Sequence, residues 1–217
     1  MNRKQQSGFT LVEIAIVLVI VGLLIGGVLK GQEMITNAKL KRIESDNAGL
    51  AAAMFSYQDR YLQLPGDDSD AENRFTVYSG NSDVNGSGNG VIDGAWDANN
   101  GVTIGSGSVE SELFFGHLRA AGLIPGGSGM DTTRPTNAYG GLIGIQNGAL
   151  GISGHVTVFG QIEGAIARIL EARIDDNNRA TGRMRGVDPG GDINSALDAT
   201  ADSAYQDSSR YHLVFRL

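Results

Sequence analysis

Cysteine is absent from this chain of 217 residues, and proline is rare, with four residues. No disulfide can therefore stabilise the fold, even outside the cytoplasm. The first proline is Pro65, so no proline interrupts a helix before that point. Basic residues are also few, with 17 Lys and Arg against 24 Asp and Glu. Because phosphate recognition needs a basic surface, nucleic-acid binding is not expected.

The longest apolar stretch runs from Phe9 to Leu29, and its polar side chains are those of Thr10 and Glu13. About 20 helical residues, at roughly 1.5 Å each, cross the hydrocarbon core of a membrane. The stretch lacks the small-residue cleavage site of a conventional secretory signal, so we expect it to be retained. Arg3 and Lys4 precede it, and the positive-inside tendency keeps them in the cytoplasm. The rest of the chain should then lie outside the cytoplasm.

Glu13 is the unusual residue of this stretch. A carboxylate at the centre of a membrane helix costs about 2.5–3.5 kcal/mol, and snorkelling lowers that cost near a helix end. One interpretation is an interfacial glutamate in a simple anchor. The other is a carboxylate that has a cationic partner in a neighbouring chain.

The stretch "SGFTLVE", which contains Gly8, Phe9 and Glu13, resembles the class III signal of type IV pilins and type II secretion pseudopilins. The resemblance implies that a membrane-embedded prepilin peptidase cleaves after Gly8 and methylates the new amino group of Phe9. It also implies assembly into a filament, where Glu13 of one subunit faces the Phe9 amine of another. Removing one partner of such a desolvated pair leaves an uncompensated charge, at a cost of about 3–5 kcal/mol.

Helical spacing of apolar residues continues beyond the membrane stretch and predicts one helix over residues 9–62. Residues 9–29 form its transmembrane or filament-core part, and residues 1–8 form the cleaved cationic leader. Residues 63–217 should form a globular pilin-like head with a Gly- and Asp-rich loop at 65–108. The predicted fold class is α+β, with a long N-terminal helix, a C-terminal antiparallel sheet and additional short helices.

The stretch "DVNGSGNGVIDGAWD" raises the question of a metal site. Calcium takes six to eight oxygen ligands, and short oxygen side chains around glycine turns can supply them. The candidate ligands are Asp83, Asn85, Ser87, Asn89, Asp93 and Asp97. The bidentate glutamate of an EF-hand is missing, although Asp93 or Asp97 could replace it. A series of Asx turns explains the same pattern without a metal. The resemblance adds some support to calcium, because some pseudopilins use calcium in place of a disulfide, but the Asx turns remain the first interpretation.

The head contains several further patterns. "SVESELFFGHLRAAG" predicts a short helix with Ser108 as its N-cap and His117 on its inward face. "GGLIGIQ", "GALGIS" and "HVTVFG" predict three strands of a meander, separated by glycine turns or by an Asn-Gly turn at Asn147–Gly148. The terminal "RYHLVFRL" predicts a strand that closes the sheet. Residues 161–175 carry a helical apolar stripe. Asp175 and Asp176 follow it, and we interpret them as a cap or a second loop site rather than a catalytic pair.

No nucleophile elbow, His-based metal motif or phosphate loop accompanies these patterns, so an enzyme is not expected. The sequence predicts a structural subunit of a type IV pilus or a type II secretion pseudopilus. Its expected partners are prepilin peptidase, identical or related pilin subunits, an inner-membrane assembly platform and membrane lipid. It would enter the bacterial inner membrane as a single-pass precursor and then join a periplasmic pseudopilus or a cell-surface pilus. The alternative is a membrane-anchored, extracytoplasmic module for calcium binding or adhesion, outside any filament.

Overall fold

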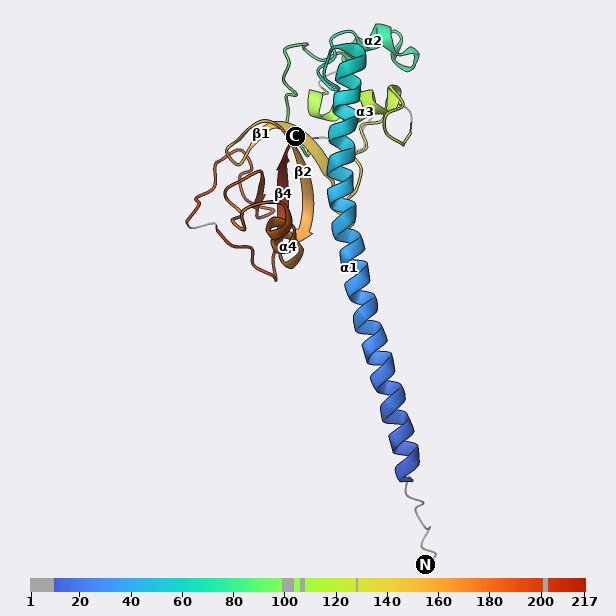
Figure 1. Cartoon of the computed structure of the whole chain (residues 1–217). Helices are drawn as coiled ribbons and strands as arrows, with labels where there is room; N and C mark the ends of the chain where they lie inside the picture. Colours follow the sequence, from blue (N-terminus) through green and yellow to red (C-terminus); the bar gives the residue numbers. More distant parts are fainter. Residues whose placement is uncertain (1–9, 99–103, 106–107, 128, 201–202) are drawn as a thin grey trace, which may run out of the picture. The chain divides into compact units, whose positions relative to one another are not determined.

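The computed structural model describes residues 10–98, 104–105, 108–127, 129–200 and 203–217 (Figure 1). Its contacts divide the chain into two compact units, Met1–Lys41 and Arg42–Leu217. The division falls inside the long N-terminal helix, whereas the sequence placed the boundary at the end of that helix. Side-chain packing explains the position of this division, because only the second half of the helix belongs to a packed core.

Helix α1 extends from Leu11 to Tyr61 and has 51 residues, which makes it about 75 Å long. Its first half is rich in Leu, Ile and Val, and no proline interrupts it. In its second half Ile43, Leu50 and Tyr57 are buried, at intervals of seven residues that keep them on one face. Leu62 ends the helix in the left-handed region, with φ 57°.

The segment between α1 and the sheet contains four short elements, which are α2 (Ala71–Arg74), η1 (Thr76–Tyr78), η2 (Ser82–Val84) and α3 (Glu110–Ala120). The predicted short helix is α3. Its N-cap is Val109 rather than Ser108, and no side chain caps it. The hydroxyl of Ser108 instead accepts a hydrogen bond from the Gly105 N–H at 3.2 Å. This hydroxyl therefore binds the turn that precedes α3 and does not cap the helix.

The sheet has four antiparallel strands in the order β1-β2-β4-β3, namely β1 (Ile143–Ala149), β2 (Ile152–Glu163), β3 (Met184–Val187) and β4 (Arg210–Arg216). The predicted "GALGIS" strand was wrong, because Leu150 and Gly151 have φ 50° and 80° and form the turn between β1 and β2. The expected Asn147–Gly148 turn is instead a register shift within β1. The predicted terminal strand is confirmed as β4, which lies between β2 and β3.

Helix α4 (Gly164–Ile174) begins three residues later than predicted, because β2 continues to Glu163. It contacts β2, β3 and β4, and its buried side chains include Ile166 and Leu170. Trp96 belongs to a core cluster that also contains Val156, Val158 and Val214 of the sheet. The predicted α+β class, with its long N-terminal helix, antiparallel sheet and short helices, is confirmed.

Candidate functional site

The first candidate site is the apolar part of α1. Its large apolar side chains are exposed throughout, from Leu11 at 88% to Leu29 at 61%. An 18-residue window of this helix has a mean hydropathy of 2.8, and none of that window is buried. Its glycines are not required by the chain's own packing, because a Cβ at Gly22, Gly26 or Gly27 would meet nothing within 4 Å. Among the residues that the structure describes, none therefore covers this surface.

Glu13 lies in the first turn of this helix, where Thr10 binds it. Its Oε2 accepts two hydrogen bonds at 2.8 Å, from the backbone N–H and from the hydroxyl of Thr10. The Glu13 N–H donates in return to Thr10 Oγ1 at 3.3 Å. These reciprocal bonds form a capping box, for which the sequence signal is T-x-x-E. The sequence reasoning missed Thr10, although "TLVE" carries this signal. Gly8 and Phe9 lie outside the described residues.

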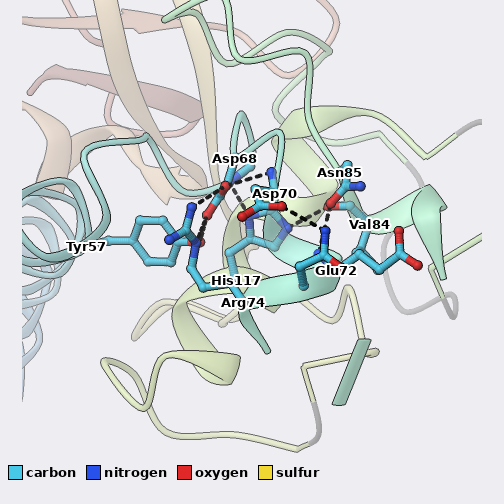
Figure 2. Close-up of polar contacts among 10 residues, drawn as sticks. Tyr57, Asp68, Asp70, Glu72, Arg74, Val84, Asn85 and His117 are labelled. Carbon is cyan, nitrogen blue, oxygen red and sulfur yellow. Dashed lines mark hydrogen bonds and ion pairs between the residues drawn. The ribbon is translucent and has the colours of Figure 1, made fainter. Parts of the chain in front are cut away.

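The second candidate site is a buried polar network between α1 and the loop that follows it (Figure 2). Asp68 is fully buried, and its Oδ2 accepts hydrogen bonds from Tyr57 Oη at 2.6 Å and Arg74 Nε at 2.8 Å. Burial opposes the ionisation of Asp68, but the Arg74 and Tyr57 bonds and the Asp70 N–H lower its pKa below the usual value. The ionised carboxylate therefore ties the loop to α1.

His117 of α3 joins this network through its two ring nitrogens (Figure 2). Its Nδ1 accepts a hydrogen bond from the Gly66 N–H at 2.9 Å, and its Nε2–H donates to the Val84 carbonyl at 2.8 Å. Complete burial lowers the pKa of His117 to about 4, although the Val84 bond and the Asp68 charge oppose this effect. The ring is therefore neutral and links three segments, whereas the sequence had suggested a partly buried residue of a helix face.

Two further buried carboxylates hold the glycine-rich loop. Asp67 Oδ1 accepts hydrogen bonds from Ser87 Oγ and the Asn89 N–H, both at 3.0 Å, and its Oδ2 accepts one from the Gly90 N–H at 2.7 Å. Glu110 accepts hydrogen bonds from the N–H groups of Ser87 and Asp93 at 2.7 and 2.8 Å. Protein donors thus occupy these two carboxylates, which connect the glycine-rich loop to the start of α3 and to the segment after α1.

The predicted calcium ligands are spread along this loop. Asn85 Oδ1 accepts a hydrogen bond from the Glu72 N–H at 2.9 Å, and Asn89 Oδ1 accepts one from the Val91 N–H at 2.7 Å. Asn89 Nδ2 donates to Asp93 Oδ2 at 3.4 Å. Asp83, Asp93 and Asp97 do not form a group of three with metal-ligand spacing; among the described residues, the group that does is Glu171, Asp175 and Asp176. Calcium binding by the loop stays a prediction.

Comparison with known proteins bears on the N-terminal segment. Residues 3–29 match the family model of the prokaryotic N-terminal methylation motif, which confirms the prepilin resemblance of "SGFTLVE". A solved structure, that of the major type IV pilin PilA1 from Clostridium difficile, is similar over 83% of this chain and 96% of that chain. Its sequence identity is 14% and its TM-score is 0.39, a similarity too weak to support a functional conclusion. No curated protein matches the chain. The chain thus carries a prepilin-type methylation motif at the start of an exposed apolar helix.

Proposed function

We propose that this protein is a non-enzymatic structural subunit of a type IV pilus or a type II secretion pseudopilus. The precursor inserts into the bacterial inner membrane with its head outside the cytoplasm. Prepilin peptidase then cleaves after Gly8 and methylates the amino group of Phe9. An assembly platform moves the mature chain into a filament of identical or related subunits.

The observation that carries this proposal is the combination of the methylation motif with the exposed apolar helix. Residues 3–29 match the motif, and the large apolar side chains from Leu11 to Leu29 lie exposed. Full burial of one such side chain from water is worth about 1.5–3 kcal/mol. Lipid satisfies this surface in the precursor, and the helices of neighbouring subunits would satisfy it after extraction from the bilayer. In the filament, close packing between helices would then replace the contacts between each helix and lipid.

The capping box between Thr10 and Glu13 affects how Glu13 can pair with a neighbouring subunit. Thr10 would be the second residue of the mature chain, so cleavage after Gly8 leaves the bonds between Thr10 and Glu13 intact. The box keeps the Glu13 carboxylate at the positive end of the helix dipole. The Phe9 ammonium of a neighbouring subunit must therefore approach a carboxylate that already accepts two hydrogen bonds. A carboxylate has about four acceptor positions, so Glu13 can bind both groups at once.

A substitution series tests whether Glu13 acts between subunits. Glu13→Gln removes the charge and keeps the size, whereas Thr10→Val removes only the hydroxyl of the capping box. We expect Glu13→Gln to insert and to be processed but to reduce the yield of sheared filaments at least tenfold. Thr10→Val should assemble close to the wild-type level, because the Thr10 N–H still binds Glu13.

Glu33→Gln is the matched control. Glu33 is an exposed glutamate of the same helix, and its Oε2 lies 2.8 Å from Lys30 Nζ. An exposed pair of this kind contributes at most about 1 kcal/mol, so normal filament yield is expected. Wild-type yield from Glu13→Gln would contradict the proposed intersubunit pair. Display of the head on the membrane without incorporation into filaments would instead support the anchored module.

A further inference from the structure

Three carboxylates meet at the C-terminal end of α4. Glu171 belongs to the last turns of the helix, and Asp175 and Asp176 directly follow it. One oxygen atom from each residue lies within 4.8 Å of the other two. Oxygen atoms that share a calcium ion at 2.3–2.6 Å can be at most about 5 Å apart. The spacing of this cluster, which we call the α4 carboxylate cluster, therefore allows all three residues to reach one ion.

An independent observation points to a missing ligand of Glu171. The residue is 1% exposed, and its Oε1 has no hydrogen-bond partner. Leaving a buried carboxylate oxygen without a partner is unfavourable, since protein interiors normally pair such groups. A positive ion would supply the missing partner of Glu171 Oε1.

Neighbouring groups hold the cluster in place. Tyr205 Oη donates a hydrogen bond to Glu171 Oε2 at 3.0 Å, which leaves Oε1 available. Asp175 Oδ2 accepts a hydrogen bond from the Met184 N–H at 2.6 Å. A Cβ at Gly182 would lie 2.2 Å from that same oxygen, so only glycine lets the loop approach so closely. Second-layer bonds of this kind orient the ligands of metal sites.

We propose that the α4 carboxylate cluster binds one divalent cation, with calcium preferred. All three groups are hard oxygen donors, which suit calcium and magnesium rather than the metals that favour histidine or cysteine. Calcium accepts irregular geometry and carboxylates that bind through one or two oxygens, whereas magnesium requires a regular octahedron at 2.0–2.1 Å. The ion would fasten the end of α4 to the loop that precedes β3. This inference is independent of filament assembly.

The test is calcium binding by the full chain in detergent micelles after removal of metals with EGTA. Titration calorimetry with Ca²⁺ should show saturable binding, and Tb³⁺ should give luminescence excited through tyrosine, because Tyr205 touches the cluster. Glu171→Gln and Asp176→Asn should each weaken Ca²⁺ binding at least tenfold. Asp176 is exposed, so its substitution tests the site even if Glu171→Gln fails to fold.

Two control variants locate the ion. Asp192→Asn is the matched control, because Asp192, like Asp176, is exposed and accepts hydrogen bonds from the N–H group two residues ahead and from a hydroxyl. Asp93→Asn probes the glycine-rich loop. Both controls should change the calcium dissociation constant by less than twofold. The inference is overturned if the wild type shows no saturable binding or if Glu171→Gln and Asp176→Asn bind normally. Loss of binding in Asp93→Asn alone would also overturn it and place calcium in the glycine-rich loop.

Discussion

Protonation of His117 should open the head of the protein as the pH falls. The neutral ring accepts one backbone hydrogen bond, from Gly66, and donates one, to Val84. A protonated ring would carry a hydrogen on Nδ1 that points at the Gly66 N–H. It would also bury a positive charge, because His117 is completely buried. Acid should therefore destabilise the junction of α1, α3 and the loop between them.

The pKa of His117 sets the size and the sign of this effect. Burial lowers this pKa from the usual 6.5 to about 4. The unfolded chain thus takes up a proton near pH 6.5, and the folded chain does so only near pH 4. The contribution of His117 to the unfolding free energy is complete above pH 6.5 and is lost as the pH falls towards 4. The loss amounts to about 3 kcal/mol, at about 1.4 kcal/mol per pH unit.

The assay is denaturant unfolding of the full chain in nonionic detergent, followed by the fluorescence of Trp96. Trp96 is the only tryptophan and is 6% exposed, so it reports on the packing of the head. His117→Gln does not titrate, so the difference between wild type and variant cancels the other ionisable groups. Between pH 7 and pH 4, the wild type should lose about 3 kcal/mol of unfolding free energy relative to His117→Gln. A difference that does not change with pH would refute the role assigned to His117.

Three substitutions test neighbouring parts of the head in the same unfolding assay. Tyr57→Phe should cost about 1.5–3 kcal/mol, because it removes a hydrogen bond to the buried, ionised Asp68; a cost below 0.5 kcal/mol would contradict this. Asp67→Asn should cost about 1–3 kcal/mol and speed proteolysis of the glycine-rich loop, because an amide cannot accept all three loop hydrogen bonds; unchanged proteolysis would show that other contacts hold the loop. Gly144→Ala should lower the unfolding free energy by about 1–3 kcal/mol, because its Cβ would lie 2.2 Å from the Trp96 carbonyl oxygen. Wild-type stability of this variant would mean that the backbone can move to make room for the methyl group.

Local patterns predicted the parts of the fold that depend on local forces. The helix that became α1 has dense apolar periodicity and no proline, so its sequence signal was strong. Strand β3 was missed, because Met184–Val187 has four residues and the sequence around it is typical of a polar turn. The hairpin turn was misplaced, because Leu150 takes a positive φ that is rare for leucine, whereas Asn147–Gly148 has the usual turn signature.

The buried polar network could not be read from the sequence in the same way. Asp67 and Asp68 follow Pro65 and Gly66, a context typical of an exposed turn, yet both are buried. Their partners lie far along the chain. Ser87, for example, is 20 residues from Asp67. Long-range hydrogen bonds of this kind leave no local pattern, so only the fold reveals them.

The α4 carboxylate cluster was predicted in part. Asp175 and Asp176 stood out as a cap or a second loop site, but Glu171 was overlooked. The spacing from Glu171 to Asp175 is four residues, which places two side chains on the same helix face. That signal was available in the sequence. The burial of Glu171 was not, because it arises from the tertiary fold, in which Glu171 binds Tyr205, 34 residues further along the chain.

The proposed function requires that the N-terminal segment is processed as a prepilin. Its most direct test is the intact mass and N-terminal residue of the protein isolated from native membranes and from sheared surface filaments. Prepilin processing predicts a chain that begins at Phe9 and carries one methyl group on its amino terminus. A chain that retains Met1, or one cleaved beyond Leu29, would contradict prepilin processing and would mean that the segment is a simple anchor or signal.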